Sequence, residues 1–170
     1  GDYIRVITKS ANPTVDFNIT SSSGAESVSS AALTVDLSSS STQNVTVNAS
    51  LSSAATTAVT VPITVSGSAT AGTDYTNAPA SITIAAGSTT GSASFSVIGD
   101  TTVESNETVV LTMGAPTGAT LGSNTTYTHT ITNDDVPTIS FTTSAASTTE
   151  GNSGTQTVTV NASLSSAAAS

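Results

Sequence analysis

The chain has 170 residues, of which only 8% are charged and 4% aromatic. Two basic and eleven acidic residues give a formal net charge of −9, which argues against nucleic acid as a partner because phosphate binding needs Lys and Arg. Cysteine is absent, so neither a disulfide framework nor a Cys-ligated metal site is expected. The sequence contains no run of 18 apolar residues, so it predicts no membrane-spanning segment. The composition favours an extracellular protein, at a cell surface or secreted.

The sequence nearly repeats itself at an offset of 124 residues. Residues 7–17 return in similar form as residues 131–141, and the same offset places Glu26 on Glu150. A fixed period is the sequence signature of a repeat protein, in which one period corresponds to one folding unit. We therefore predict that the chain belongs to a tandem array.

A second match sets the boundaries of the unit. Residues 45–54 return as residues 158–167 at an offset of 113, so the first copy carries 11 extra residues before this segment. The predicted complete unit covers residues 13–136. Residues 1–12 are interpreted as the last strand of a preceding repeat, and residues 137–170 as the first strands of the next one.

Short stretches that alternate apolar and polar residues recur along the chain, separated by Gly, Ser, Asn and Pro. This pattern predicts an all-β protein, and no segment shows a helical stripe. The predicted strands, in chain order, are 14–19, 32–37, 44–51, 58–65, 80–84, 91–98, 107–113 and 127–132. Two such sheets bury their aliphatic faces against each other, so we expect an immunoglobulin-like antiparallel β-sandwich.

Side-chain alternation predicts which residues of each strand face the core. In the strand over 91–98, Phe95 and Val97 are expected to point inward, together with Ala93. The single histidine, His129, has threonine on both sides. We interpret it as a solvent-facing strand residue without a catalytic role.

The acidic residues gather where predicted strands end. Six of the eleven acids lie in three such places: Asp74; Asp100, Glu104 and Glu107; Asp134 and Asp135. Oxygen donors from several loops, without His or Cys nearby, match the ligands that calcium takes. The competing interpretation is that these residues form turns and stay solvated, because Asp readily caps turns. Spacing alone leaves both interpretations open.

An ordered series of motifs resembles one known family. The motifs lie at residues 65–75, 84–91, 100–108, 119–122 and 130–135. Together they are similar to the Calx-beta domain, a sandwich module of sodium/calcium exchangers and of many bacterial surface proteins. The resemblance implies the sandwich fold, calcium as the bound ion, and a bacterial-type extracellular protein.

The resemblance also implies a ligand set. The positions that match calcium ligands of the family are Glu26, Asp74, Asp100, Glu104, Glu107, Asp134 and Asp135, with the backbone carbonyl of Thr102. Two departures stand out: Gly99 precedes Asp100 where an Asp pair is common, and Asn133 replaces the first of the closing Asp residues. Fewer or weaker calcium sites are therefore expected than in a sensor domain.

Two functional classes follow from the sequence, and neither is an enzyme. No serine lies in a nucleophile elbow, and the chain has no Trp to line a sugar-binding cleft. In the first class, the protein is a structural or adhesive repeat of an extracellular filament or long surface protein, stiffened by calcium. In the second, it is a calcium-dependent module that recognises a glycan or a protein.

The expected partners are neighbouring repeats or identical subunits. The segment 31–37 reads as a strand beyond the usual family complement, and residues 137–170 form an incomplete unit. Both features favour assembly by strand exchange, in which one subunit completes the sheet of another.

Overall fold

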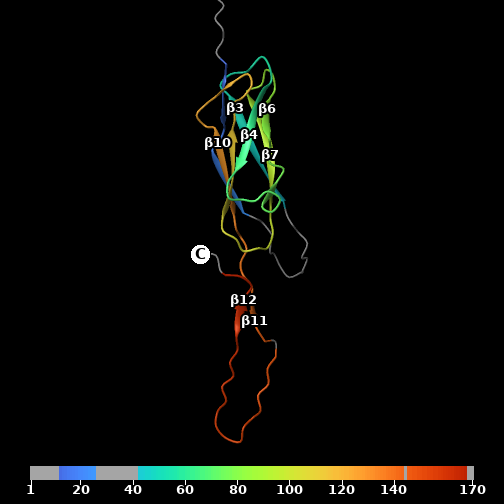
Figure 1. Ribbon diagram of the computed structural model, residues 1–170, viewed down its shortest axis with the longest axis vertical. Helices are drawn as coiled ribbons and strands as arrows, with labels where there is room; N and C mark the ends of the chain where they lie inside the picture. Colours follow the sequence, from blue (N-terminus) through green and yellow to red (C-terminus); the bar gives the residue numbers. More distant parts are fainter. Residues whose placement is uncertain (1–11, 26–41, 144, 168–170) are drawn as a thin grey trace, which may run out of the picture.

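The computed structural model describes residues 12–25, 42–143 and 145–167, and Figure 1 shows two β-sheets stacked above a separate small hairpin. The predicted strand over 32–37 and the predicted ligand Glu26 lie outside the described residues. Among the residues that are described, no helix is long and apolar enough to cross a bilayer. The predicted all-β sandwich is confirmed.

Ten strands of the described residues form the sandwich. They are β1 (Thr14–Phe17), β2 (Ser21–Ala25), β3 (Thr42–Leu51), β4 (Val59–Ser66), β5 (Tyr75–Thr76), β6 (Ser81–Ile84), β7 (Thr90–Ile98), β8 (Glu107–Met113), β9 (Thr120–Leu121) and β10 (Thr126–Thr132). One sheet has the order β5, β7, β3, β1, β9, and the other the order β2, β10, β8, β4, β6. A third sheet of two strands pairs β11 (Ile139–Phe141) with β12 (Ala162–Leu164).

The chain crosses from one sheet to the other between β1 and β2, where a single strand over 14–19 was predicted. The Asn18 amide still donates to the Asn48 carbonyl at 3.0 Å, beside β1. Two residues later, the Thr20 carbonyl accepts from the Thr128 amide of β10 at 2.8 Å. Strand β2 then pairs with β10 in parallel, and β1 pairs with β9 in parallel, which departs from a wholly antiparallel sandwich.

The core lies between the two sheets and is built from inward-facing aliphatic and aromatic side chains. Phe95 and Val97 are buried, as the alternation predicted. Phe17 of β1 packs across the core against Tyr127 of β10, with ring centroids 6.0 Å apart. Each large apolar side chain buried in this way contributes roughly 1.5–3 kcal/mol.

The prediction that His129 faces solvent is wrong, because the side chain is only 4% exposed. Along β10 it alternates with Tyr127 and Ile131, which are both buried, so it has to share their inward side. Its ring meets Phe95 edge-on, with the centroids 5.6 Å apart. Its Nδ1 lies 2.6 Å from Ser22 Oγ, which also contacts the Tyr127 hydroxyl. Polar neighbours in the sequence therefore do not show which side of a strand a residue occupies.

Burial lowers the pKa of His129 below its ordinary value of 6.5. The unfolded chain then binds a proton at higher pH than the folded chain does. The histidine's contribution to stability is present above the unfolded pKa and is lost as the pH falls from about 6.5 towards the lower folded pKa. We expect the free energy of unfolding to fall less between about pH 7.5 and pH 5.5 in His129→Gln than in the wild type. Urea titrations at both pH values check this, and parallel changes in the two proteins would contradict it.

Candidate metal centre

Asp74 is held firmly at the end of a tight turn that leads into β5. Its amide donates to the Thr70 carbonyl at 2.9 Å, and its side-chain Oδ2 accepts from the Thr70 amide at 2.5 Å. Its own carbonyl accepts from the Ile98 amide of β7 at 2.8 Å. The side chain is 4% exposed, so this carboxylate is both oriented and largely removed from water.

Two glutamates approach Asp74 from the segment between β7 and β8. Glu107 is the first residue of β8 and pairs with Ile131 of β10, so its backbone is fixed within the sheet. Glu104 lies in the preceding loop, and its amide donates to the Asn133 side-chain oxygen at 2.9 Å. Both glutamates are half-buried.

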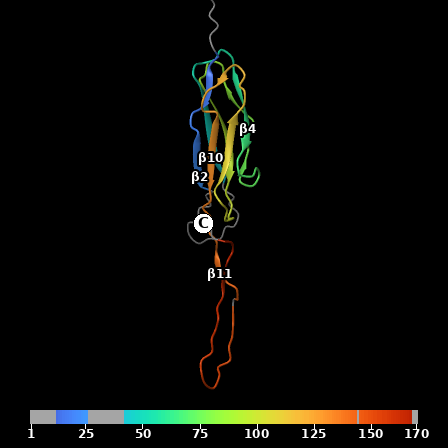
Figure 2. The same ribbon diagram turned by 60° about the vertical axis from the view of Figure 1, so that its left-hand side comes forward.

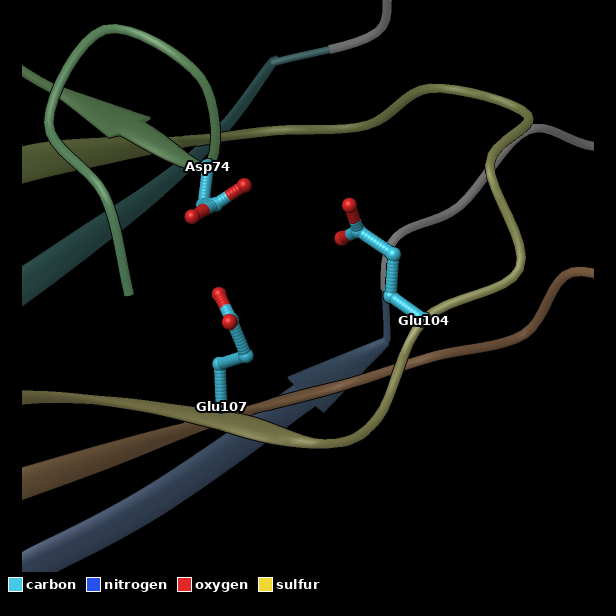
Figure 3. Close-up of side chains that lie close together, drawn as sticks. All are labelled: Asp74, Glu104 and Glu107. Atoms are coloured by element: carbon cyan, nitrogen blue, oxygen red, sulfur yellow. The ribbon is translucent and has the colours of Figure 1, made fainter. Parts of the chain in front are cut away.

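The three carboxylates converge, and Figure 3 shows them pointing toward a common space. One oxygen from each of Asp74, Glu104 and Glu107 lies within 4.8 Å of the others. Calcium binds oxygen at about 2.3–2.6 Å, so two ligands of the same ion lie at most about 5 Å apart. We call these three residues the carboxylate triad; their spacing and their oxygen donors fit a calcium ion.

The electrostatics of the triad also favour a cation. Burial raises the pKa of Glu107, and its hydrogen bond to the Asp74 side chain and the charges of Asp74 and Glu104 raise it further. Burial raises the pKa of Glu104 as well, with the charges of Asp100, Asp74 and Asp135 adding to the effect. Ionised carboxylates only accept hydrogen bonds, so carboxylates this close repel one another unless a proton or a cation lies between them.

The other predicted ligands that the structure describes lie outside the triad. Asp100 accepts a hydrogen bond of 2.6 Å from the Thr102 amide, which forms a local turn. Burial raises the pKa of Asp135, and the negative charges of Asp134 and Asp100 raise it further. Asp135 Oδ2 is buried and has no hydrogen-bond partner among the described residues.

A pocket of about 640 Å³ adjoins these residues, between the sandwich and the β11–β12 hairpin. Thr102, Asp134 and Asp135 line it, and Ser165 and Ser166 line it from the hairpin. The described acids among the predicted ligands thus meet at one end of the sandwich. Within the described part of the chain three of them form a compact ligand set, and the ligand roles of the others remain predictions.

Comparison with known proteins identifies the family. A family model for the Calx-beta domain matches residues 24–135. The chain belongs to the Calx-beta domain family. This is a family of calcium-binding, non-catalytic modules, which agrees with the carboxylate triad and with the absence of a nucleophile motif.

Solved structures share the fold at low sequence identity. The apo-form Calx CBD1 domain is 19% identical with a TM-score of 0.58, and the match covers 72% of this chain and 98% of that one. CBD12 from CALX1.2 is 20% identical with a TM-score of 0.58, covering 77% of this chain and 48% of that one. A putative carbohydrate binding protein from Bacteroides ovatus is 11% identical, with a TM-score of 0.51 over 76% of this chain and 39% of that one. No curated protein matches the sequence significantly.

Asn133 has a structural role that the sequence did not reveal. It is the position at which this Calx-beta domain departs from the usual acidic pattern. Its side-chain oxygen accepts from the Glu104 amide, and its Nδ2 donates to the Asp135 carbonyl at 3.0 Å. Its own amide donates to the Asn106 side chain at 3.1 Å. Asn133 therefore ties the loop that carries Glu104 to the segment that leaves the sandwich. An aspartate could not supply the donor that Nδ2 provides.

Proposed function

We propose that this Calx-beta domain binds calcium through Asp74, Glu104 and Glu107, and that it serves as a structural or adhesive repeat of an extracellular filament or long surface protein. The convergence of three partly desolvated carboxylates within 4.8 Å is the observation that carries this proposal. Carboxylates at this spacing repel one another unless a proton or a cation lies between them. Calcium, an oxygen-binding cation, fits the donor set.

The position of the triad supports a stiffening role for the ion. Its ligands come from the turn before β5, from the loop between β7 and β8, and from the start of β8. Through Asn133 that loop is bonded to the segment that continues to β11. An ion held by the triad would restrain the end of the sandwich from which the next unit departs.

The proposed setting is the cell surface or the medium outside the cell, with neighbouring repeats or identical subunits as partners. The net charge of −9 favours solubility, which suits a protein exposed to the medium outside the cell. Calcium sites of extracellular modules typically have dissociation constants of about 10⁻⁴–10⁻³ M, which is weaker than those of cytosolic sensors. The proposed site is expected to bind calcium in that range.

The alternative role is calcium-dependent recognition of a glycan or protein, and the putative carbohydrate binding protein with this fold favours it. Sugar-binding surfaces usually present exposed aromatic rings. The chain has no Trp, and Tyr75 and Tyr127 are buried. Among the described residues, the exposed aromatic side chain is Phe141, which lies on the β11–β12 hairpin. The structural role is therefore preferred.

Amide hydrogen exchange with calcium or with chelator tests the proposed function. We expect calcium to slow exchange over residues 70–74, 100–108 and 133–138, because the ion would hold these segments together. Residues 151–156 at the distal end of the hairpin serve as an internal control and should exchange equally under both conditions. Identical exchange throughout the chain with and without calcium would contradict the proposal.

A further inference from the structure

His129 lies beneath strand β2, which covers both nitrogens of its ring. Its Nδ1 lies 2.6 Å from Ser22 Oγ. At the other nitrogen, a Cβ built on Gly24 would lie 3.6 Å from Nε2 and from Cε1. Nε2 itself is buried and has no hydrogen-bond partner among the described residues. The access of water to this imidazole therefore depends on where β2 lies.

Strand β2 is held largely through its backbone. Its side chains from Ser21 to Ser23 are polar and Gly24 has none, so these residues bring no apolar side chain to the core. The strand pairs with β10 in parallel and ends the order of its sheet in the described part of the chain, and Figure 2 shows the two strands side by side. Ser22 anchors it through Oγ, which contacts both His129 and the Tyr127 hydroxyl. Elements with few buried apolar contacts open locally before the whole domain unfolds.

The contacts of His129 suit a neutral imidazole and not a charged one. A neutral ring carries one N–H, and Nδ1–H can donate to Ser22 Oγ while Nε2 stays unprotonated. An imidazolium carries an N–H on both nitrogens. Protonation therefore places a buried donor at Nε2, where no acceptor among the described residues bonds it, together with a buried positive charge.

The groups around the ring do not compensate a positive charge. Phe95 of β7 meets the ring edge-on, and Val109 of β8 is paired opposite His129. Gln43 of β3 brings a neutral amide, whose Oε1 lies 3.5 Å from the same built Cβ of Gly24. The titratable neighbour is the Tyr127 hydroxyl, which shares Ser22 Oγ with the imidazole and is neutral below about pH 10. Burial is the cause that lowers the pKa of His129, with no contribution from a carboxylate.

We propose that His129 and β2 form a proton-sensitive latch, in which protonation of His129 releases β2 from β10 while the rest of the sandwich stays folded. Release lets water reach both ring nitrogens, so the cost of burying the charge disappears. It also opens the backbone edge of β10, and such an edge can pair with another extended strand. The latch uses no member of the carboxylate triad and is independent of the proposed calcium function.

The expected size of the effect follows from linkage. In the released state His129 regains its ordinary pKa of about 6.5. Each pH unit below that value multiplies the population of released strand by up to about tenfold, until the lower pKa of the closed state is reached. Between pH 7.5 and pH 5.5 the released population should therefore rise about five- to tenfold.

Amide hydrogen exchange of the full chain at these two pH values tests the latch, after correction for the direct effect of pH on the chemical exchange rate. We expect the protection of residues 21–25 to fall about five- to tenfold at the lower pH. Residues 162–164 of β12, on the separate hairpin, are the control and should keep their corrected protection (Figure 1). Equal protection of β2 at both pH values would overturn the proposal.

Urea separates local release from unfolding of the whole sandwich. Local release exposes little surface, so the exchange of residues 21–25 should change little up to about 1 M urea, whereas residues 109–113 of β8 should exchange markedly faster. Strand β2 should also be less protected than β8 at both pH values. If the two strands share the same protection and the same urea dependence, β2 leaves only with the whole sandwich and the proposal is wrong.

Ser22→Ala and Ser23→Ala form a matched pair on the same strand. Ser22→Ala removes the hydroxyl that contacts His129 and Tyr127, so the protection of β2 at pH 7.5 should fall about two- to tenfold. Ser23 is exposed, and Ser23→Ala should change that protection by less than about twofold. Equal effects of the two substitutions would contradict the anchoring role of Ser22.

His129→Gln removes the titrating group and should abolish the pH dependence of residues 21–25. The wild type supplies a further test, because His129 is the single histidine of the chain and its ring-proton NMR signal is unambiguous. That signal should shift over the same pH range in which β2 loses protection. Full pH dependence in His129→Gln, or a ring that titrates while β2 keeps its protection, would overturn the proposal.

Discussion

Phe17→Ala is expected to lower the free energy of unfolding by about 3–5 kcal/mol, because it leaves a cavity at the centre of the sandwich. Phe17 is 1% exposed and packs against Tyr127 from the opposite sheet. The substitution therefore removes both buried apolar area and the aromatic contact that joins the two sheets. Urea unfolding followed by circular dichroism measures the change.

Ile19 provides a matched control for Phe17. It lies two residues further on, where the chain crosses between the sheets, and it is 51% exposed. Ile19→Ala should change the free energy of unfolding by no more than about 0.5 kcal/mol. If the two substitutions cost the same, the assignment of Phe17 to the core and of Ile19 to the crossing is wrong.

Glu107→Gln is expected to change stability in opposite directions with and without calcium. Because the folded pKa of Glu107 is raised above 4.5, the stability associated with its protonated form is lost as the pH rises through that folded pKa. In chelator at neutral pH the wild type therefore carries a destabilising carboxylate, and the neutral glutamine should be more stable. In calcium the wild type gains the binding free energy, and the variant should be the less stable protein.

The size of the calcium effect follows from mass action. Mutation of a residue that only supports a metal ligand typically weakens metal binding 10- to 100-fold. Loss of a ligand carboxylate should therefore weaken calcium binding about 100-fold or more. At calcium equal to 100 times the wild-type Kd, the wild type gains about 2.7 kcal/mol and the variant about 0.4 kcal/mol. Thermal unfolding in calcium and in chelator measures both values. Glu150→Gln, an exposed carboxylate on the hairpin, is the control and should behave like the wild type.

Much of the sandwich could be predicted because its strands alternate strongly. Phe95 and Val97 carry that signal clearly, and they are buried where the alternation placed them. Strand β2 could not be found, because Ser21–Ala25 has no apolar alternation and forms a strand through its backbone pairing with β10. The crossing at Asn18 has no local signature either, since it depends on which sheet offers a hydrogen-bond partner.

The candidate site was predictable in composition but not in arrangement. Acidic residues at strand ends pointed to one end of the sandwich, and Asp74, Glu104 and Glu107 do converge there. The sequence could not separate these three from Asp134 and Asp135, because the difference arises from the path of the loop before β8. Nor could it reveal that Asn133 bonds that loop to the outgoing segment, since the contact joins residues 29 positions apart.

Calorimetric titration of the wild-type chain with calcium at neutral pH tests the central claim most directly. The carboxylate triad predicts saturable binding of calcium by the wild type. The same titration of Glu107→Gln should show at least about a 100-fold weaker interaction. No saturable heat from the wild type up to about 10 mM calcium, ten times the weakest range of extracellular modules, would contradict the claim. So would equal binding by the wild type and the variant.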